Sequence, residues 1–360
     1  MKILHLETGR FFYGGPQQVI YLCNALKDLN VDNILVCPPD SEIDEIARKI
    51  GIRVINLRCG GDFDIFFGYS LWKMLRKEKP DIVHCHSRRG ADFIGGRVSL
   101  LANIPAVITR RVDNLESKFL AKLRYKPFNK IIVISKNIQT VLKNTGIKKK
   151  VTCIYSAVDS DQFFKPKNFK WFYENFSVSE DNFVILSASQ FIARKGHKYL
   201  LHAVANLRNK FPQIRLVIFG RGPKENEMKQ LCKRLKLEDI VQFRGFCIDL
   251  DNFIGCFDLL VHPATQEGLG VIVLKSAASG IPVVGFNVGG LRESVLNGKT
   301  GLLVKNRDGH ALQKSIAAFI NNEEFYEKSS SVAKRWVRDR FTIKTMVKKH
   351  LKVYKSILND

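Results

Sequence analysis

The sequence lacks the features that mark several protein classes. No apolar run approaches the roughly 20 residues that a membrane-spanning helix needs. Met1 leads directly into a strand-like segment, without the small-residue cleavage site of a secretory signal. Walker A, H-E-x-x-H and serine-nucleophile patterns are absent, as are homeodomain, zinc-finger, RRM and KH signatures. We therefore expect a protein of the cytosol without specific nucleic-acid recognition.

The cysteine pattern gives no sign of a disulfide framework or a zinc site. The chain has 8 cysteines but no C-x-x-C pair, and several lie inside apolar segments such as "NILVCPP". Disulfides and zinc ligation are the alternatives. In a chain of this length without an export signal, buried free thiols are the better interpretation. This also favours the cytosol.

Acidic residues are scarce relative to basic ones. Lys and Arg total 58 against 34 Asp and Glu, a net charge of +24. The excess is spread over the chain, with 27 basic against 16 acidic residues in 1–165 and 31 against 18 in 166–360. Such a field attracts nucleic acid, anionic lipid headgroups or phosphorylated substrates. A basic, solvated surface without a partner is the alternative.

Strand-like and helix-like segments alternate along the chain. Its 360 residues favour two domains, and 45% hydrophobic residues suffice for two cores. Continuous Ile/Val runs such as "KIIVIS" and "IRLVIFG" indicate strands buried on both faces, hence parallel sheets covered by helices. We predict an α/β fold with two facing Rossmann-like, doubly wound domains, 1–165 and 166–340. An amphipathic C-terminal helix, 341–360, is expected to pack back on the first domain. Residues 157–182 read as an irregular connection.

The segment "HPATQEGLGVIVLKSAASGIPVVGFNVGGLRESV" is the most informative in the chain. A strand delivers a turn with Glu267, Gly268, Leu269 and Gly270, and a helix then begins near Val271. Unpaired N–H groups at such a helix start favour anions, and the glycines allow a phosphate or sugar to approach the backbone. Glu267 could accept hydrogen bonds from sugar hydroxyls. The alternative is that the glycines only form turns.

A second candidate lies in "SQFIARKGHKYLL", just after the first strand of the second half. Arg194 and Lys195 occupy a loop that leads into a helix, where paired cations can neutralise a pyrophosphate. Two basic residues on a loop are also common in a chain this rich in lysine. The glycines of "VIFGRGPKENE" do not form a G-x-G-x-x-G fingerprint, so a dinucleotide site is weakly indicated.

Candidate residues of the first half follow its strands. Gly14 and Gly15 stand where a helix begins after the opening strand, and "DIVHCHSRRG" ends a strand with His84 and His86. These two histidines share a face because strand side chains alternate. We interpret His86 as a ligand-site residue and His84 as a core histidine. A zinc site is disfavoured because no second ligand cluster exists. Three D-x-D pairs, Asp62/Asp64, Asp159/Asp161 and Asp249/Asp251, could hold a divalent ion but fall outside the Gly-rich turns.

Taken together, these segments resemble the retaining glycosyltransferases of family 4, which have the GT-B fold. The motifs are "GGPQQV", "DIVHCHSRRGADFIG", "VISKNI", "YSAVDSDQF", "RKG", "VQFRGF" and "QEGLGVIVLKSAASGIPVVGFNVGGLRESVLNGKTGLLV", so the resemblance covers nearly the whole chain. It implies that the second domain binds a nucleotide-diphosphate sugar, UDP- or GDP-linked, and the first domain an acceptor. It implies no metal and no other cofactor.

The resemblance also implies roles for single residues. Lys195 and Arg194 balance the diphosphate, Glu267 holds a sugar hydroxyl, and backbone amides of the segment 268–271 contact sugar and phosphate. His86 matches the active-site histidine that meets the transferred sugar. Glycines 14 and 15 make room for the diphosphate. The chain departs from the pattern at Gln190, where many relatives have an arginine, so that phosphate contact weakens or moves to Arg194.

A second departure is Lys275, eight residues after Glu267, where the family pattern has a glutamate that binds the ribose hydroxyls. An ammonium group cannot accept hydrogen bonds. Lys275 could donate to ribose oxygens, reach a phosphate or pair with an acid elsewhere in the chain. It also leaves open a catalytically weak or inactive relative that binds a sugar nucleotide or glycan.

The resemblance and the charge together suggest the overall activity. A retaining enzyme of this kind aligns its substrates and stabilises the leaving diphosphate, while the donor phosphate takes the acceptor's proton. The expected acceptor is a cell-envelope glycan or glycolipid, of the lipopolysaccharide type for example. The basic first half suits peripheral contact with an anionic membrane, at its inner face.

Overall fold

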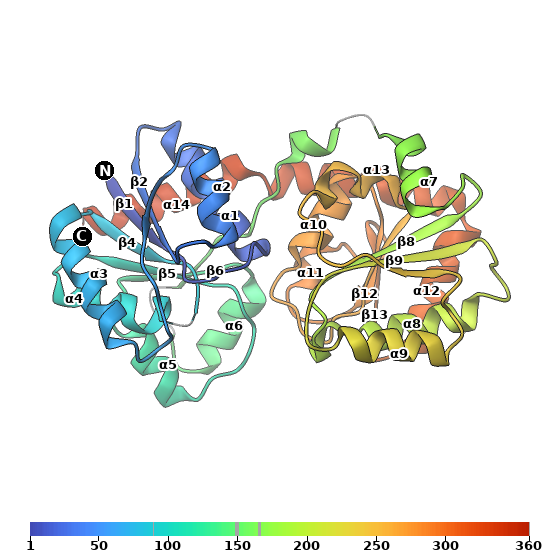
Figure 1. The fold of residues 1–360 in the computed structure, drawn as a ribbon, viewed down its shortest axis with the longest axis horizontal. Coiled ribbons are helices and arrows are strands. Elements are labelled where there is room, and N and C mark those ends of the chain that lie inside the picture. Colours follow the sequence, from blue (N-terminus) through green and yellow to red (C-terminus); the bar gives the residue numbers. More distant parts are fainter. Residues whose placement is uncertain (89, 148–150, 165–166, 360) are drawn as a thin grey trace. The chain divides into compact units, whose positions relative to one another are not determined.

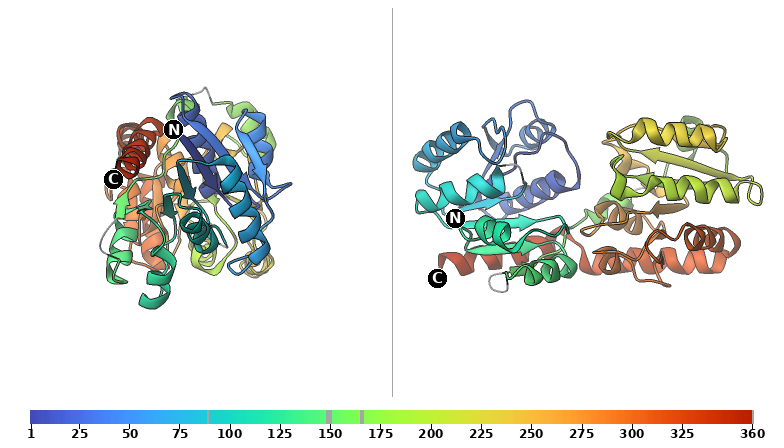
Figure 2. Two further views of the ribbon diagram at one scale, coloured as in Figure 1. Left: turned by 90° about the vertical axis from the view of Figure 1, so that its left-hand side faces the viewer. Right: turned by 90° about the horizontal axis from the view of Figure 1, so that it is seen from below.

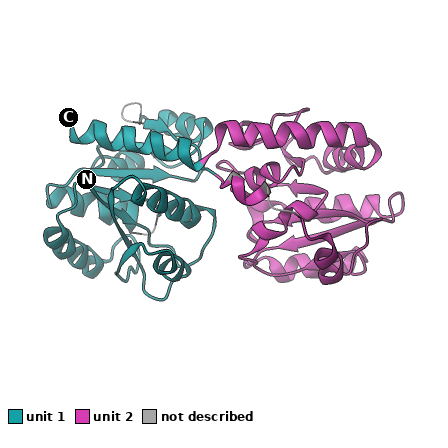
Figure 3. Cartoon of the chain, turned by 90° about the horizontal axis from the view of Figure 1, so that it is seen from above, with its two compact units in different colours: residues 1–157, 343–360 teal, residues 158–342 magenta. Residues whose placement is uncertain are grey.

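The computed structural model describes residues 1–88, 90–147, 151–164 and 167–359, arranged in two compact units. Unit 1 comprises residues 1–157 and 343–360, and unit 2 comprises residues 158–342 (Figure 3). Our expected first boundary lay at residue 165, whereas unit 2 here begins at Val158. The reason is local: the Val158 N–H donates to the Phe341 carbonyl (2.8 Å), at the end of the last helix of unit 2.

Unit 1 is a seven-stranded parallel sheet with helices on both faces (Figures 1 and 2). Its strand order is β3-β2-β1-β4-β5-β6-β7. The strands are β1 (Lys2–Leu6), β2 (Asp32–Cys37), β3 (Arg53–Asn56), β4 (Ile82–Cys85), β5 (Ala106–Arg110), β6 (Lys130–Val133) and β7 (Val151–Cys153). The helices are α1 (Gly14–Lys27), α2 (Glu42–Lys49), α3 (Ile65–Glu78), η1 (Ala91–Gly95, a π-helix), α4 (Gly96–Leu101), α5 (Lys118–Tyr125), α6 (Lys136–Asn144) and α14 (Ile343–Leu358).

The sheet of unit 1 is buried because its strands are apolar on both sides. In β1, Ile3, Leu4 and Leu6 are all fully buried. One core cluster joins Leu22 of α1 to Tyr354 of α14, which therefore packs in unit 1. The Tyr354 hydroxyl also lies 2.7 Å from Nδ1 of His84 on β4.

Unit 2 repeats this plan with a six-stranded parallel sheet of order β10-β9-β8-β11-β12-β13. The strands are β8 (Phe183–Ala188), β9 (Ile214–Phe219), β10 (Val241–Phe243), β11 (Leu259–His262), β12 (Val283–Phe286) and β13 (Gly301–Val304). The α-helices are α7 (Phe169–Phe176), α8 (His197–Leu207), α9 (Glu225–Arg234), α10 (Val271–Ala278), α11 (Leu291–Ser294), α12 (Gly309–Asn321) and α13 (Glu323–Arg340). Short 3-10 helices are η2 (Ser160–Phe164), η3 (Ala193–Lys195), η4 (Leu250–Asn252) and η5 (Ile254–Cys256). The predicted α/β fold with two Rossmann-like domains is confirmed.

Helix α7 lies within the segment that we expected to be irregular, and for residues 169–176 that expectation was wrong. The Asn168 side chain caps the helix by accepting from the Trp171 N–H (3.0 Å). Phe172 and Phe176, one turn apart, bury their rings against Phe257, with ring centroids 4.8 and 5.9 Å away. The aromatic residues that suggested a connection therefore anchor a helix on the core of unit 2.

The order of strands reverses once in each sheet. In unit 1 the sequential strands run outward from β1 through β2 in one direction and from β4 in the other, and in unit 2 β8 and β11 form the same junction. The loops that leave these strands at their carboxyl ends diverge, which makes this the usual ligand position of doubly wound sheets. Within the described residues, no helix combines the length and the apolar character needed to cross a membrane.

Candidate functional site

In unit 2, two loops meet at the carboxyl ends of β8 and β11. The loop after β8 holds Arg194 and Lys195, and the loop after β11 holds Glu267. Thr265 ties the two loops together, because its N–H donates to the Arg194 carbonyl (2.8 Å). Lys195 and Glu267, which lie 72 positions apart in sequence, are thereby brought side by side.

Lys195 and Glu267 form an ion pair at this junction. Lys195 Nζ lies 2.5 Å from Glu267 Oε2, and the two side chains are only 12% and 13% exposed. The same carboxylate oxygen lies 2.8 Å from Nε2 of His262, the last residue of β11. The other oxygen, Oε1, accepts from the Gly268 N–H (3.1 Å). We expected Lys195 and Glu267 to bind different parts of a donor, whereas in the structure they are direct partners.

The protonation of this group follows from its surroundings. Burial raises the pKa of Glu267, but the Lys195 ammonium and the His262 hydrogen bond together hold that pKa well below its usual range. Burial lowers the pKa of His262 although the bond to Glu267 opposes this shift. At neutral pH, Glu267 is therefore an ionised carboxylate and His262 a neutral imidazole. Since the carboxylate can only accept, His262 carries its proton on Nε2.

Helix α10 begins immediately beside Glu267 without a side-chain cap. Its N-cap is Gly270, whose φ of +84° is a conformation that residues with a side chain rarely adopt. Gly268, Leu269 and Gly270 are buried, and the first-turn N–H groups at Val271 and Ile272 lack the partners of a helix interior. Gly290 closes the turn from behind: its N–H donates to the Glu267 carbonyl (2.9 Å), and a Cβ there would overlap the Gly268 carbonyl oxygen.

The two remaining predicted donor residues lie on the β8 loop. Arg194 is partly exposed, and its Nη1 is 3.5 Å from the Gln266 carbonyl, so its guanidinium is held only weakly. Gln190 lies just after β8 and is half-buried. The ligand-binding roles of both, and of Lys195, Glu267 and residues 268–271, remain predictions.

Lys275 has a definite partner. On α10, its Nζ lies 2.8 Å from Asp251 Oδ2 in η4, and the side chains are 14% and 8% exposed. Of the three roles that we considered for Lys275, the structure has the pairing with an acid. Asp251 belongs to a D-x-D pair that sequence analysis had set aside. The ammonium charge is thus balanced within unit 2 rather than left for a phosphate.

In unit 1, the predicted residue His86 lies at the carboxyl end of β4, beside β1. It is almost fully buried, and its Nε2 lies 3.0 Å from Nδ1 of His5. Its Nδ1 has no hydrogen-bond partner among the residues that the structure describes. Burial, and then the neighbouring His84, lower the pKa of His86 well below its usual value. His86 is therefore a buried, neutral imidazole with one unsatisfied ring nitrogen, and its role toward a ligand stays a prediction.

The ring nitrogens of His5, His84 and His86 lie within 4.8 Å of one another, close enough to bind one metal ion. Two of the three histidines already use both nitrogens. His84 contacts Tyr354 and Thr109, and His5 contacts His86 and Asn33, at 2.7 to 3.0 Å. A metal ion would have to replace these contacts, so the cluster fits a hydrogen-bonded core better than a metal centre. His84 has the core role that we predicted for it.

Gly14 and Gly15 form the start of α1, which also lacks a side-chain cap. The side chain of Arg111, which follows β5, lies against Gly15: a Cβ there would be 3.5 Å from Arg111 Cδ. Burial lowers the pKa of Arg111 to about 10, although the carboxyl of Glu7, at the end of β1, opposes this shift. Sequence reasoning missed Arg111 and Glu7. Their positions just after strands β5 and β1 were the available signal.

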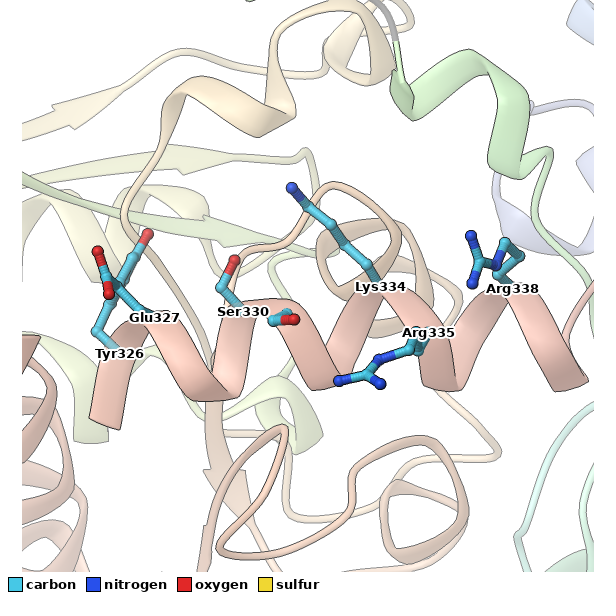
Figure 4. A pocket seen from close by; sticks show the side chains of 7 residues that line it. Tyr326, Glu327, Ser330, Lys334, Arg335 and Arg338 are labelled. Atoms are coloured by element: carbon cyan, nitrogen blue, oxygen red, sulfur yellow. The ribbon is translucent and has the colours of Figure 1, made fainter. Parts of the chain in front are cut away.

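A separate pocket lies along α13 in unit 2. Figure 4 shows it, lined by Tyr326, Glu327, Ser330, Ser331, Lys334, Arg335 and Arg338. None of the predicted site residues contributes to it. Its cations make it a basic surface, but no buried polar group of this pocket points to a particular ligand, so it adds nothing to the candidate site.

The fold and the site define a class of protein. Two units, each with a parallel, doubly wound sheet, are the architecture of GT-B glycosyltransferases. Residues 13–162 match the model "Glycosyltransferase Family 4", and residues 170–336 match the model "Glycosyl transferases group 1". The two matches together span most of the chain, which therefore belongs to the glycosyltransferases of the family 4 type.

Known proteins agree with this assignment. The chain is 21% identical over 308 residues to an N-acetyl-alpha-D-glucosaminyl L-malate synthase of Bacillus anthracis, covering 83% of this chain and 80% of that protein. It is 23% identical over 330 residues to the lipopolysaccharide core biosynthesis glycosyltransferase LpsE of Rhizobium meliloti, covering 89% of each. The crystal structure of Anabaena Alr3699/HepE in complex with UDP and glucose superposes with a TM-score of 0.89 at 21% identity, covering 99% of this chain and 100% of that one. At 21% identity, the similarity to the HepE structure shows the fold alone.

Proposed function

We propose that this glycosyltransferase moves a sugar from a UDP- or GDP-sugar to a cell-envelope glycan or glycolipid, with retention of the anomeric configuration. The observation that carries the proposal is the Lys195–Glu267 ion pair beside the uncapped start of α10. The loops after β8 and β11 thereby bring together a cation, a hydrogen-bond acceptor and the unpaired N–H groups of a helix start. A sugar diphosphate needs these three kinds of partner.

In the proposed chemistry, the groups of unit 2 bind the donor and stabilise its leaving group. Lys195 and the first-turn amides of α10 stabilise negative charge as the diphosphate leaves. Glu267 stays ionised and oriented by His262, so it can accept from a sugar hydroxyl when Lys195 turns toward phosphate. These protein groups balance the diphosphate charge, and we propose no metal ion. The bound UDP of the HepE structure and the lipopolysaccharide role of LpsE support the donor and acceptor classes.

The test is nucleotide-sugar binding and turnover by the purified protein. A panel of UDP- and GDP-sugars is screened by thermal shift, since a ligand of the native state raises the melting temperature. Lys195→Ala is expected to weaken binding of the stabilising donor by about 10- to 100-fold, because a charge-assisted hydrogen bond contributes about 1.5–3 kcal/mol. Lys198→Ala is the matched control, an exposed lysine on the same stretch. Equal affinity of both variants would refute the assignment of Lys195.

The stereochemistry is tested on the same preparation. Proton NMR of the product or of the slowly hydrolysed donor is expected to show the anomeric configuration of the donor. An inverted product contradicts the retaining mechanism.

A second candidate function is binding without catalysis, and the observation in its favour is Lys275. The family's ribose-binding glutamate is replaced by a lysine whose charge Asp251 already neutralises. A protein of this kind would bind a sugar nucleotide in the thermal-shift screen and hydrolyse or transfer none of it. If the wild type turns over a sugar nucleotide and Lys195→Ala does not, the protein is an enzyme rather than a binding protein.

The charge of +24 supports a further part of the proposal, peripheral contact with an anionic membrane on its cytoplasmic side. A glycolipid acceptor would be met there. Vesicle binding that is independent of anionic lipid would contradict this part.

A further inference from the structure

Helix α3 of unit 1 exposes aromatic and aliphatic side chains to solvent. Ile65, Tyr69 and Trp72 follow one another at helical spacing along its outer side, and Phe66 lies beside them. Ile65 and Phe66 are 76% and 80% exposed. The inner side of the helix, with Phe67, Leu71 and Leu75, is buried as usual. The outer residues therefore do not serve the core of unit 1.

Helices α4 and α5 also expose apolar side chains to solvent. Leu101, at the end of α4, is 74% exposed. On α5, Phe119 is 74% exposed, and Leu120 and Leu123 are also exposed, while Ala121 and Tyr125 face inward. More than half of the large hydrophobic side chains that the described chain exposes lie between Phe63 and Leu123. Monomeric proteins rarely leave such a concentration of apolar surface uncovered.

These helices contact one another through η1, around Phe93. Phe63, just before α3, packs edge-on against the Phe93 ring at 5.7 Å. The Arg97 guanidinium of α4 lies 3.7 Å over the same ring, and its Nη2 donates to the Leu123 carbonyl of α5 (3.0 Å). Helix α3 packs on η1 at Gly68, where a Cβ would be 3.4 Å from Ile94 Cγ2. Figure 1 labels the three helices in the same part of unit 1.

We name this surface the α3–α5 face. It consists of the exposed apolar side chains of the three helices and of the residues just before α3 and α5: Phe63, Ile65, Phe66, Tyr69, Trp72, Leu100, Leu101, Leu115, Phe119, Leu120 and Leu123.

The charges of the α3–α5 face are mainly positive. Four acids, Asp62, Asp64, Asp113 and Glu116, lie in the segments just before α3 and α5; of these, Asp64 caps α3 and Glu116 is bound by Arg88 and Arg110. Exposed cations flank the apolar side chains on α3 and beside α5: Lys73, Arg76, Lys77, Lys118, Lys122 and Lys126. The one acid within α3 is Glu78, which is held by Lys2 (3.0 Å) and Arg53 (2.7 Å), and α4 and α5 contain no acid. In η1, Asp92 is buried and bound to Arg124. The face therefore combines exposed apolar side chains with an excess of positive charge.

We propose that the α3–α5 face docks unit 1 on the surface of an anionic lipid bilayer. Aromatic rings such as Trp72 and Tyr69 insert at the level of the headgroups, and the surrounding lysines contact anionic lipid. A second copy of this chain is a poorer occupant, since an isologous dimer would bring the two sets of cations together. This inference rests on the proposed function only in that the acceptor would be met at the same membrane.

The experiment measures vesicle binding without any donor or acceptor, so that its result is independent of sugar transfer. The full chain is sedimented with vesicles of equal parts phosphatidylglycerol and phosphatidylcholine, and with vesicles of phosphatidylcholine alone. We expect binding to the anionic vesicles and little to the neutral ones. Trp72 fluorescence is expected to shift to shorter wavelength on binding, and Trp72→Phe to lose most of that shift.

Paired variants test the face itself. Phe66→Ser with Phe119→Ser is expected to weaken vesicle binding at least about 10-fold, because each change removes an aromatic ring that the bilayer would bury. Lys73→Gln with Lys77→Gln is expected to weaken it about 30-fold, since each cation near the surface contributes about a fivefold factor. Leu29→Ser and Lys143→Gln are controls, an exposed leucine and an exposed lysine of unit 1 outside the face.

The outcomes separate the two proposals. Wild-type binding by both paired variants overturns the α3–α5 face as the docking surface. A concentration-dependent dimer that Phe66→Ser with Phe119→Ser dissociates, without vesicle binding by the wild type, also overturns it in favour of self-association. If sugar transfer fails while the paired variants lose vesicle binding, the face stands and the proposed function falls.

Discussion

Replacing Lys275 with glutamate would restore the acid of the family pattern, and the structure predicts that this change harms the protein. Asp251 Oδ2 lies 2.8 Å from Lys275 Nζ, and both side chains are largely buried. A glutamate at position 275 would place a second carboxylate against Asp251 in place of an ammonium. We therefore expect Lys275→Glu to destabilise unit 2.

The magnitude follows from the geometry. Two unit charges about 4 Å apart interact by about 4 kcal/mol at an effective dielectric constant near 20. Protonation of one carboxyl limits the cost, since neutralising a glutamate at pH 7 requires about 4 kcal/mol. Removal of one partner of a buried pair costs about 3–5 kcal/mol by itself. A loss of about 4 kcal/mol in a unit of this size corresponds to a fall in melting temperature of roughly 10 °C.

The assay is thermal unfolding of four proteins: wild type, Lys275→Glu, Asp251→Asn and the double variant. The amide that Asp251→Asn introduces is uncharged and can donate a hydrogen bond to the carboxylate that Lys275→Glu introduces. The double variant should therefore recover more than half of the stability that Lys275→Glu loses. Such a coupling is the signature of a direct pair. If Lys275→Glu melts within about 2 °C of the wild type, the ion pair does not stabilise unit 2 and our explanation of Lys275 is wrong.

Three further predictions concern other parts of the chain. Gly290→Ala should push the Gly268 turn away from α10 and abolish the thermal shift by nucleotide, whereas Gly309→Ala, with no atom near its Cβ position, should preserve it; equal shifts in both would contradict the role of the turn. Glu267→Gln should abolish turnover yet bind free UDP at least as tightly as the wild type in titration calorimetry, since Lys195 is no longer neutralised; weaker UDP binding would count against the pairing. Burial lowers the pKa of His5 to about 4 and those of His197 and His350 to about 3. The unfolded chain therefore binds more protons below about pH 6.5, so stability should fall by several kcal/mol as the pH drops from about 7 to about 5, partly offset by Asp258, whose pKa burial raises to about 6. A melting temperature that does not fall over this range would contradict our conclusion that these histidines are buried and neutral in the folded protein.

The fold could be predicted because its signals are local and repeated. Runs such as "KIIVIS" and "IRLVIFG" contain β6 and β9, and the amphipathic segments between such runs form helices. Helix α7 was missed because its aromatic residues were taken for an irregular connection. Their helical spacing, Phe172 to Phe176, was visible, but the Phe257 surface that they cover is distant in sequence.

The partners within the candidate site were harder to predict than its residues. Lys195 and Glu267 could be selected from loop position and residue type, but their ion pair depends on how the β8 and β11 loops pack. A lysine in an apolar helix requires an acid nearby, so the sequence indicated that Lys275 has an acidic partner. Only tertiary structure could choose Asp251 among the available acids. His262 had a signal, a histidine at the end of a strand five residues before Glu267, which we did not use.

The last helix belongs to the first unit, and this has a consequence for biosynthesis. Helix α14 covers the sheet of unit 1 with Met346, Val353 and Tyr354, yet its residues leave the ribosome only after all of unit 2 has been made. Unit 2 is one contiguous segment and can complete its folding first, whereas in the nascent unit 1 the part of the sheet that α14 covers stays exposed until α14 is made. Truncation by some twenty residues at the carboxyl terminus should therefore damage the amino-terminal unit, and a fragment of residues 1–157 should aggregate unless the helix is supplied to it.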